Sequence, residues 1–437
     1  MRNISIIGTG YVGLVTGVGL AEFGNKVICV DIDKDKISQL KAGLVPIYEP
    51  GLEEIIKRNV KSERLYFSDD ISLSIQKSQV IIIAVGTPQT SDGVANMEYV
   101  NSVVRAINKN LKDYKIICTK STVPIGTGGR IIKTLSNDFK EGVDYDYVSN
   151  PEFLREGSAV KDFLWPDRII IGTNSDKAYE IMCDIYRPLY INKNPIKHTT
   201  VETAEMIKYA SNSFLALKIS YINEIANLCE TVGADIHDVA SAMGQDGRIS
   251  DKFLHPGPGF GGSCFPKDLE SLIAISKEKN IPMETLSAAK KANINQKAKM
   301  GTKLENLINA SLKDKKIAVL GLSFKANTDD VRESSSIDMI EFILSKGGIV
   351  SAYDPIANAS MLKLFNNISY FDDVYDAVKG ADALVVMTEW NEFRALDLPR
   401  IKNIMKSAFI LDTRNIINMS ELSNLGFVYD NIGRIKI

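Results

Sequence analysis

The sequence of 437 residues has almost no net charge and no long apolar run. Its 52 Lys and Arg residues balance 54 Asp and Glu residues, which excludes the strongly basic surface typical of nucleic-acid or membrane-surface binding. No segment approaches the ~20 consecutive apolar residues of a membrane span, and glycines interrupt the N-terminal segment before it could form the apolar core of a signal peptide. We therefore expect a protein that binds neither nucleic acid nor a membrane.

Cysteine is also scarce. The five cysteines are odd in number and widely scattered, which does not suit a disulfide framework and favours a reducing compartment, so we expect a cytoplasmic location. What the sequence does contain is 45% apolar and 24% charged residues, the composition of an ordinary globular protein. Its length is sufficient for two or three domains of roughly 100–200 residues each.

A glycine-rich turn lies near the N-terminus, between a short β-rich run at residues 3–7 and an apolar helical stretch. The turn reads GTGYVG, and the next apolar strand ends at Asp31. A strand, this glycine pattern, a helix and an acidic residue ~20 positions further on are typical of a dinucleotide site. Gly8 would permit the tight turn, Gly10 the approach of a pyrophosphate and Gly13 close helix–strand packing.

Asp31 indicates which dinucleotide binds. A carboxylate there would accept hydrogen bonds from the adenosine ribose and repel a 2′-phosphate, which favours NAD over NADP. Lys36 could contact the same ribose edge, although a solvated helix lysine is an equally good interpretation. Two further apolar strands end in the segments 86–88 (GTP) and 121–124 (STVP). Because ligands bind beyond the carboxyl ends of parallel strands, both segments should border the cofactor.

Two regions in the middle of the chain carry groups suited to catalysis. Glu152 and Glu156 follow each other closely near an expected strand end, where they could do acid–base work, although this segment alone favours surface glutamates. Residues 201–233 have the apolar spacing of one long helix, on which Lys208 and Asn212 share a face because they are four residues apart. An exposed lysine is the alternative for Lys208. A long helix between two domains is also a natural site for subunit contacts.

The stretch 256–269, PGPGFGGSCFPKDL, surrounds Cys264 with glycines and prolines. Pro266 suits the first turn of a helix, and the residues after it have helical apolar spacing. Cys264 should therefore directly precede a helix N-terminus, where the macrodipole and the nearby Lys267 favour the nucleophilic thiolate. A buried structural cysteine remains an open alternative for this stretch alone. Arg248, in the preceding polar loop, is a candidate anion ligand.

The C-terminal third repeats the strand–helix alternation but lacks the glycine fingerprint. Lys325, Arg332 and Arg414 supply cations that could hold another phosphate-bearing molecule, while a purely structural domain is the alternative. The whole pattern predicts an α/β protein with two Rossmann-like doubly wound domains joined by a long central helix. The expected boundaries are an NAD-binding domain at 1–199, a central helical linker and dimerisation domain with the cysteine loop at 200–300, and a second Rossmann-like domain at 301–437.

The order of these motifs resembles the nucleotide-sugar 6-dehydrogenases of the UDP-glucose/GDP-mannose dehydrogenase family over essentially the whole chain. The motifs that carry the resemblance are GTGYVG, VGTP, STVPIGT, NPEFLREG, PDRIIIG, the helix with Lys208 and Asn212, PGFGGSCFPKD, GLSFKANTDDVRES and LDTRN. The resemblance implies a four-electron oxidation of a sugar C6 alcohol to a carboxylate by two NAD and one water, with UDP-glucose as the small-molecule substrate. It further implies that the C-terminal domain binds the UDP-sugar, and we expect a homodimer or higher homo-oligomer formed through the central helix.

The resemblance also implies chemical roles for individual residues. Cys264 would hold the intermediate aldehyde as a thiohemiacetal and then as a thioester, while Lys208 and Asn212 would stabilise oxyanion character. The remaining members of the implied catalytic set are Asp268, which would order Lys208 or a catalytic water, Glu156, which would activate the water that hydrolyses the thioester, Thr122, which would position that water, and Glu152, whose role is less defined.

The motifs and the resemblance together define two binding sets and no metal site. The NAD set consists of Gly8, Gly10, Tyr11, Val12, Gly13, Asp31, Lys36, Thr87, Thr122, Glu156, Lys267 and Arg332. The substrate set consists of Glu152, Phe153, Leu154, Lys208, Asn212, Arg248, Phe253, Gly261, Lys325 and Arg414.

Other activities share parts of this pattern. GDP-mannose and UDP-N-acetylhexosamine 6-dehydrogenases are the alternatives within the family, against which PDRIIIG (166–172) and the helix segment 213–224 favour the UDP-glucose branch. A two-electron, hydroxyacid-type NAD dehydrogenase would share the first domain and the long helix but would not need Cys264. An NAD-sensing scaffold is disfavoured because the catalytic residues occur together.

Overall fold

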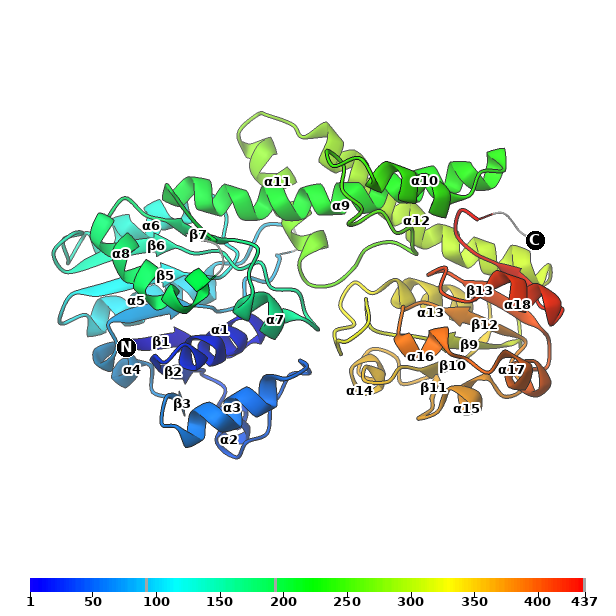
Figure 1. Cartoon of the computed structure of the whole chain (residues 1–437), viewed down its shortest axis with the longest axis horizontal. Helices are drawn as coiled ribbons and strands as arrows, with labels where there is room; N and C mark the ends of the chain where they lie inside the picture. Colours follow the sequence, from blue (N-terminus) through cyan, green and yellow to red (C-terminus); the bar gives the residue numbers. More distant parts are fainter. Residues whose placement is uncertain (91–92, 192–194, 435–437) are drawn as a thin grey trace. The chain divides into compact units, whose positions relative to one another are not determined.

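The computed structural model describes residues 1–90, 93–191 and 195–434 (Figure 1). It divides into two compact units, Met1–Ser211 and Asn212–Ile437, which we call unit 1 and unit 2. Helix α9 (Val201–Val232) begins in unit 1 and continues into unit 2. Two α/β units joined by a long central helix confirm the predicted fold class. The division into three domains remains a prediction.

Unit 1 is built on a sheet with the strand order β3-β2-β1-β4-β5-β6-β7-β8. Neighbouring strands from β3 to β6 are parallel, whereas β7 is antiparallel to β6 and parallel to β8. Val80–Ile83 is apolar at every position and wholly buried, because helices cover both faces of a parallel sheet. The strands are β1 (Asn3–Ile7), β2 (Lys26–Val30), β3 (Leu65–Ser68), β4 (Val80–Ile83), β5 (Lys115–Thr119), β6 (Tyr145–Ser149), β7 (Ile169–Gly172) and β8 (Ile196–Thr199).

Helices cover both faces of this sheet. They are α1 (Tyr11–Glu22), α2 (Lys34–Lys41), α3 (Leu52–Lys61), α4 (Ile71–Lys77), α5 (Glu98–Asn110), α6 (Thr127–Leu135), α7 (Ala159–Leu164) and α8 (Asp176–Ile185), followed by a 3-10 turn at Arg187–Ile191. Core residues of α1, α2, α3, α7 and α8 form one cluster with Ile82, while those of α4, α5 and α6 form another with Ile81 and Ile83. Alternate residues of one strand therefore face opposite helical layers.

Unit 2 contains a sheet whose described strands are all parallel, in the order β11-β10-β9-β12-β13-β14. Its strands are β9 (Lys316–Leu320), β10 (Ile349–Tyr353), β11 (Ser369–Tyr370), β12 (Ala383–Val386), β13 (Phe409–Asp412) and β14 (Val428–Asp430). Its further helices are α10 (Ile236–Gly244), α11 (Phe265–Glu278), α12 (Glu284–Ile308), α13 (Ser335–Ser345), α14 (Asn358–Leu362), α15 (Val374–Val378), α16 (Asn391–Arg394), α17 (Leu398–Ile404) and α18 (Met419–Asn424). Counted from the first strand of each unit, both sheets contain the order 3-2-1-4-5-6 of a dinucleotide-binding fold.

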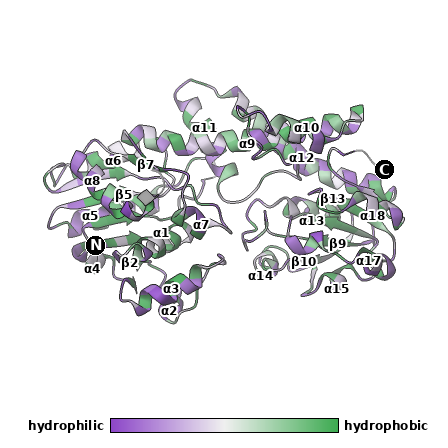
Figure 2. Ribbon diagram, in the orientation of Figure 1, coloured by the Kyte–Doolittle hydropathy of each residue, from purple (hydrophilic) through white to green (hydrophobic). Residues whose placement is uncertain are grey.

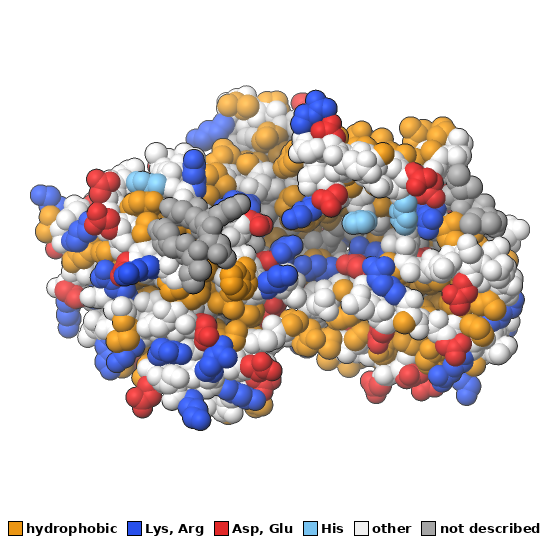
Figure 3. Space-filling model, in the orientation of Figure 1, with side chains coloured by type: hydrophobic (Ala, Val, Ile, Leu, Met, Phe, Trp, Pro, Cys, Tyr) orange, Lys and Arg blue, Asp and Glu red, His pale blue; other side chains and the backbone are white. Residues whose placement is uncertain are grey.

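The distribution of polarity agrees with the composition. The strands of both sheets are largely hydrophobic (Figure 2), and basic and acidic side chains are interspersed over the visible face of each unit (Figure 3). Within residues 1–90, 93–191 and 195–434, none of the helices combines the length and the apolar character that crossing a lipid bilayer requires.

Candidate active site

The glycine-rich turn of unit 1 connects β1 to α1. Gly8 has a φ of +102°, and a Cβ there would lie 2.6 Å from the carbonyl oxygen of Ala84. A Cβ on Gly13 would lie 1.9 Å from the carbonyl oxygen of Gly8. Both positions therefore require glycine, Gly8 for its backbone conformation and both for close packing. These are the conformational roles that the motif predicts.

Gly10 differs from the other two glycines of the motif. It is the N-cap of α1, and among the described residues no neighbouring heavy atom lies within 4 Å of a Cβ built on it. The space beside the N-terminus of α1 is thus open, and the backbone N–H groups and the helix dipole favour an anion there. This arrangement fits the diphosphate of NAD. Tyr11 and Val12 form the first turn of α1, and the Tyr11 hydroxyl accepts a hydrogen bond from the N–H of Gly157, at 2.7 Å.

Asp31 directly follows β2, at the carboxyl edge of the sheet. Its Oδ2 accepts hydrogen bonds from the N–H and the hydroxyl of Thr9, at 2.8 and 2.7 Å, and the ammonium of Lys36 lies 3.4 Å away. Burial alone would raise the pKa of Asp31, but the hydrogen bonds from Thr9 and Asp33 and the charge of Lys36 outweigh it and lower the pKa. An ionised carboxylate beside the glycine turn is suited to accept hydrogen bonds from a ribose.

The segments that follow β4 and β5 contact each other, as expected of neighbouring strand ends. The hydroxyl of Thr87 donates to the carbonyl oxygen of Thr122, at 2.8 Å. The hydroxyl of Ser121 donates to the carbonyl oxygen of Val85, at 2.7 Å. The structure therefore brings together Thr87 and Thr122, which the sequence places in the NAD set.

Glu205, on α9, holds the other end of the loop after β5. Its two carboxylate oxygens accept hydrogen bonds from the N–H groups of Gly126 and Gly128, at 2.6 and 2.8 Å, at the N-terminus of α6. Burial raises the pKa of Glu205 to about 7, although these two hydrogen bonds oppose the shift. Sequence reasoning missed this residue, because its partners lie 77 and 79 positions away.

Glu152 and Lys208 form a buried ion pair in unit 1. The ammonium of Lys208 lies 2.7 Å from Oε1 of Glu152, and the two side chains are 4% and 5% exposed. The N–H of Leu154 donates to Oε2 of Glu152 at 2.6 Å. Burial alone would raise the pKa of Glu152, but the charge and hydrogen bond of Lys208 outweigh it, so that the pKa is lowered and the group is a carboxylate. The pair excludes both the surface glutamate at 152 and the exposed lysine at 208.

The loop after this pair is fixed by residues from elsewhere in unit 1. The guanidinium of Arg168 lies 3.9 Å from the centre of the Phe153 ring, a cation–π contact. The N–H of Gly157 donates to a carboxylate oxygen of Glu49 at 2.7 Å. Glu156, beside Gly157, is partly buried. Sequence reasoning missed Glu49 because its partner lies 108 positions away and nothing in the local pattern points there.

In unit 2, Cys264 occupies the N-cap of α11, with Pro266 in the first turn of the helix. The prediction that the cysteine directly precedes a helix is therefore confirmed. The side chain of Cys264 is partly buried, and its Sγ lies 3.6 Å from the hydroxyl of Ser263. A helix N-terminus stabilises negative charge, which suits a thiolate nucleophile.

Asp268, one turn along α11, is almost completely buried. Its Oδ2 accepts a hydrogen bond from the side-chain amide of Asn212 at 2.7 Å, and its Oδ1 accepts one from the ammonium of Lys267 at 2.7 Å. The first of these bonds fixes the orientation of the Asn212 amide. Lys208 has a different carboxylate partner, Glu152, within unit 1. The expected action of Asp268 on Lys208 or on a water remains a prediction.

We call the part of the stretch 256–269 that precedes α11 the cysteine loop. Three buried side-chain amides that sequence reasoning missed hold its backbone. Asn223, on α9, accepts from the N–H of Gly257 at 2.8 Å, and Gln296, on α12, donates to its carbonyl oxygen at 2.8 Å. Asn293, on α12, accepts from the N–H of Phe260 at 2.7 Å and donates to its carbonyl oxygen at 3.0 Å. These buried backbone groups thereby find partners. The available signal was the presence of polar amides on the buried faces of two helices.

The cysteine loop also packs against aromatic rings and against the segment that follows β9. A Cβ on Gly261 would lie 2.0 Å from the carbonyl oxygen of Glu333, so that packing requires glycine there. The ring of Phe265, next to the cysteine, lies 6.0 Å from that of Phe253 and 6.2 Å from that of Phe260. The structure therefore brings Phe253 and Gly261 of the substrate set to the loop that carries the thiol.

Of the predicted cations, Arg414 borders the same loop, and Lys325 follows Phe324, whose ring packs against Gly262. Arg414 donates to the carbonyl oxygens of Met387 and Phe324, at 2.8 and 3.1 Å. Its guanidinium would lie 3.3 Å from a Cβ built on Gly257. Lys325 follows Phe324 directly, and its ammonium lies 5.5 Å from the centre of that ring.

The other two predicted arginines contact nearby aspartates. Arg332 pairs with Asp330 at 2.6 Å, and its side chain is 64% exposed, but its carbonyl oxygen accepts a hydrogen bond from the N–H of Gly262 at 2.9 Å. Its backbone thus touches the cysteine loop. Arg248 pairs with Asp246 at 2.6 Å and is 90% exposed, so it projects into solvent within unit 2.

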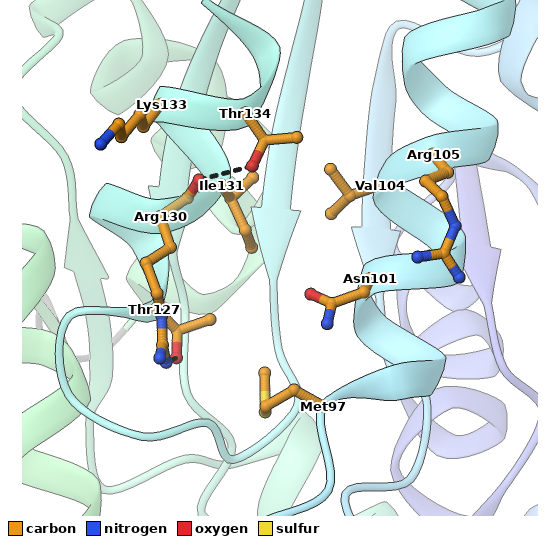
Figure 4. Close-up of a pocket in the computed structure, with 9 residues that line it drawn as sticks. All are labelled: Met97, Asn101, Val104, Arg105, Thr127, Arg130, Ile131, Lys133 and Thr134. Carbon is orange, nitrogen blue, oxygen red and sulfur yellow. Dashed lines mark hydrogen bonds between the residues drawn. The ribbon is translucent and has the colours of Figure 1, made fainter.

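None of the predicted site residues lines a groove of about 580 Å³ that lies between α5 and α6 in unit 1 (Figure 4). Apolar side chains line it, and three basic residues stand around it. Arg130 donates to the hydroxyl of Thr127 at 2.8 Å, and Arg105 pairs with Glu98 at 2.5 Å. Lys133 points away from the groove (Figure 4). Because the cations do not converge, the groove is not arranged as a phosphate site.

An open helix N-terminus for a diphosphate and a carboxylate for a ribose are what NAD requires of the protein. A cysteine at a helix N-terminus is not needed for a single hydride transfer, but it can hold an aldehyde for a second one. Within residues 1–90, 93–191 and 195–434, no group of three or more His, Cys, Asp or Glu is arranged to hold a metal ion. The fold and the site therefore define an NAD-dependent dehydrogenase that carries a cysteine at a helix N-terminus.

Comparison with known sequences identifies the family. Sequence models of the UDP-glucose/GDP-mannose dehydrogenase family match residues 2–190 as the NAD binding domain, 202–295 as the central domain and 318–419 as the UDP binding domain. The chain belongs to this family, and its cofactor is NAD. The resemblance inferred from the motifs is confirmed.

Individual relatives match over nearly their full length. The chain is 48% identical over 435 residues to a UDP-glucose 6-dehydrogenase of Rhizobium meliloti, with 99% of each chain covered. It is 45% identical over 436 residues to a UDP-glucose 6-dehydrogenase of Bacillus subtilis, covering 99% of this chain and 94% of the relative. The solved structure of a UDP-glucose dehydrogenase from the archaeon Pyrobaculum islandicum aligns with a TM-score of 0.91 and 34% identity, over 100% of this chain and 98% of that one.

Proposed function

We propose that this chain oxidises the C6 alcohol of UDP-glucose to the carboxylate of UDP-glucuronate. The full-length relatives support the substrate, and bound NAD⁺ supplies the hydride acceptor for each of the two oxidations. The observation that carries the proposal is the thiol of Cys264 at the N-cap of α11. A four-electron oxidation needs an aldehyde to be retained between two hydride transfers, and a two-electron dehydrogenase has no use for such a group.

The first oxidation removes a hydride from C6 and a proton from its hydroxyl. Glu152, ionised and buried beside Lys208, is suited to take that proton directly or through one water. The Lys208 ammonium would stabilise the negative charge that develops on the sugar oxygen. The amide of Asn212, oriented by Asp268, would donate to the same oxygen, and in a site that excludes water such donors act strongly.

The second oxidation proceeds on the enzyme. The thiolate of Cys264 adds to the aldehyde carbon and forms a C–S bond, which gives a thiohemiacetal. The addition leaves negative charge on the oxygen of the thiohemiacetal, so that loss of the second hydride from its carbon re-forms the C=O bond and gives a thioester. Attack of water then breaks the C–S bond, releases the carboxylate and returns the thiolate.

Glu156 and Glu152 are the two bases proposed for the hydrolytic water. The resemblance assigns that role to Glu156, with Thr122 positioning the water, whereas burial and the pairing with Lys208 favour Glu152. Glu152→Gln and Glu156→Gln separate the two. If Glu156 is the base, Glu156→Gln should release two NADH per active site in a rapid burst and then stall as the thioester. If Glu152 is the base of both steps, Glu156→Gln should continue to turn over, and Glu152→Gln should already form the first NADH slowly.

We further propose that unit 1 supplies the main contacts to NAD and that unit 2 supplies the contacts to the uridine diphosphate. The glycine turn, Asp31, Lys36 and Thr87 would hold NAD in unit 1, with Thr122, Glu156, Lys267 and Arg332 as further contacts. The cysteine loop, Lys325 and Arg414 would hold the uridine diphosphate in unit 2, which accords with the family's UDP binding domain at 318–419. Arg248 is the weakest member of this set because its side chain projects into solvent.

We also propose a homodimer formed through α9. Phe214, Tyr221 and Leu228 recur at intervals of seven and are 60%, 49% and 57% exposed, which makes an apolar stripe on one face of the helix. A second copy of the chain would bury this stripe. Light scattering should give twice the chain mass, and the double substitution of Phe214→Ser with Leu228→Ser should give the monomer. The cytoplasmic location remains a prediction from the cysteine pattern.

The deciding experiment measures NADH formed per sugar with UDP-glucose, GDP-mannose and UDP-N-acetylhexosamines. We expect two NADH per UDP-glucose and the highest kcat/KM for that substrate. A ratio of one NADH per sugar would contradict the covalent mechanism. A preference for GDP-mannose or for an N-acetylhexosamine would contradict the substrate.

A further inference from the structure

Lys120, which directly follows β5, is a buried lysine that neither the motifs nor the mechanism above uses. Its residue is 5% exposed. Taking an ammonium out of water is unfavourable unless other groups compensate. Its Nζ donates to the side-chain oxygen of Asn150 at 3.2 Å, a neutral acceptor that offsets only part of this cost. The hydrogen bond to Asn150 alone therefore does not explain why a charged side chain is buried in this position.

Asn150 connects Lys120 to the catalytic loop. Its side-chain oxygen also accepts from the hydroxyl of Tyr186 at 2.7 Å, and its amide donates to the carbonyl oxygen of Ile170 at 2.7 Å. The residue is thus held from three sides, and Glu152 follows it by two positions. A change at Lys120 would release one of these constraints at the start of the segment that presents Glu152.

Lys120 also shares an electrostatic environment with the buried ion pair. Burial lowers the pKa of Lys120 to about 8, the charge of Glu152 opposes the shift and the like charge of Lys208 adds to it. In return, the charge of Lys120 lowers the pKa of Glu152. The other titratable groups around Lys120 are Cys118 on β5, whose pKa burial raises to about 12, and Tyr186 after α8, whose pKa burial also raises. Both are neutral at physiological pH, and the cations whose charge lowers the pKa of Glu152 are Lys208 and Lys120.

We propose that Lys120 is a positioning residue for the oxidation proposed above. Its ammonium fixes Asn150 and thereby the loop that carries Glu152, and its charge keeps Glu152 ionised when Lys208 turns from its partner to the oxygen of the sugar. Without a second cation, Glu152 would lose its compensating charge at the moment when it must accept a proton. The inference rests on the proposed function, because it needs Glu152 as a base in the reaction.

The test compares Lys120→Met and Lys120→Arg with Lys115→Met in the full-length enzyme. Lys115 is the control, since it begins the same strand, is fully buried and donates to the carbonyl oxygen of Ser78 at 2.7 Å, although its ammonium also pairs with the exposed Asp113 at 2.8 Å. For each protein, kcat, the KM values for UDP-glucose and NAD, the pH profile of kcat and the melting temperature are measured.

For Lys120→Met we expect kcat to fall about 100-fold, because small misplacement of a catalytic group costs that much. The acidic limb of the pH profile should move upward by about one pH unit, since removal of a cation raises the pKa of Glu152. Lys120→Arg keeps the charge and should restore the position of the limb. Lys115→Met should leave kcat and the limb as in the wild type.

Three results would overturn the inference while the wild type still forms two NADH per sugar. They are a wild-type kcat in Lys120→Met, an unmoved acidic limb, and equal losses in Lys120→Met and Lys115→Met that follow the melting temperature. A wild type that oxidises no nucleotide sugar would instead refute the proposed function itself.

Discussion

The two units of this protein build the same turn and use it differently. Gly8 follows β1 in unit 1, and Gly321 follows β9 in unit 2, with φ values of +102° and +90°. In each unit an aspartate follows the second strand and accepts a hydrogen bond from the backbone of the turn, Asp31 from Thr9 and Asp354 from Leu322. The frame of a dinucleotide site is therefore present twice.

The two aspartates differ in how far protein hydrogen-bond donors already surround their carboxylates. Oδ2 of Asp354 accepts from the N–H groups of Leu322 and Ser323, from the hydroxyl of Ser323 and from the indole of Trp390, and the residue is 2% exposed. The side chain of Asp31 is 12% exposed. The Oδ2 atom of Asp354 is thus fully used in hydrogen bonds within the protein, whereas the carboxylate of Asp31 can still accept a hydrogen bond from a ligand.

The two units also differ in where the first helix after the turn begins. In unit 1, α1 begins at Tyr11, so its N–H groups face the open space beside Gly10. In unit 2, the next helix begins only at Ser335. Without a helix N-terminus at the turn, a diphosphate finds neither free N–H groups nor a helix dipole there. The same strand order therefore creates a dinucleotide site in one unit and a scaffold for the cysteine loop in the other.

The largest expected effect separates the tasks of the units. Cys264→Ser removes the thiol from unit 2 and leaves unit 1 intact, so NAD affinity should be unchanged while kcat for complete oxidation falls roughly 10³-fold or more. Stopped-flow absorbance should detect at most one NADH per active site in the first turnover. Two NADH per sugar at the wild-type rate would contradict the assignment of NAD binding to unit 1 and of the covalent step to unit 2.

The next effect concerns Glu205, which holds α6 in unit 1. Its folded pKa of about 7 exceeds the ordinary value of 4.5, so the folded protein binds this proton more tightly. Its contribution to stability is therefore full below pH 4.5 and is lost as the pH rises through 7. The difference in unfolding free energy between the wild type and Glu205→Gln should shrink by on the order of 3 kcal/mol between pH 4.5 and 8. Urea titrations across this range measure it, and a constant difference would contradict the assignment.

A smaller effect distinguishes the glycines of the first turn. Gly13→Ala places a methyl group 1.9 Å from a carbonyl oxygen, which should destabilise unit 1 by about 1–3 kcal/mol and weaken NAD binding with it. Gly10→Ala meets no neighbour, so it should leave the melting temperature unchanged and raise only the Kd for NAD. Calorimetric unfolding and NAD titration of both variants provide the measurement. Equal melting temperatures would show that packing does not require Gly13.

The smallest effect tests the two aspartates directly. Asp31→Asn should weaken NAD binding about tenfold with little change in stability, because its lost interactions are partly with the ligand. Asp354→Asn should leave the Kd for NAD unchanged and lower the melting temperature of unit 2, since each of its donors belongs to the protein. The reverse pattern would mean that unit 2 also binds a dinucleotide.

Local features of the fold and site could be read from the sequence because they depend on neighbouring residues. The helix expected at residues 201–233 is α9, Val201–Val232, and the strand expected at 3–7 is β1, Asn3–Ile7. Short strands such as β8 and β11 were missed, because four or two residues carry too little periodicity. The antiparallel β7 was missed as well, since its apolar run has no feature that sets direction.

The sequence by itself determined the α/β frames, the glycine turn and the position of Cys264 at the start of a helix, because spacing and local propensity are sufficient for each. Only the tertiary structure decided which groups became partners. Lys208 meets Glu152, and Asn212 meets Asp268, each across 56 positions of the chain. Such pairs form because strand ends and helices converge in the folded protein. Burial alone would raise the pKa of Glu152, but the charge and hydrogen bond of Lys208 outweigh it and lower that pKa, with a further contribution from the charge of Lys120.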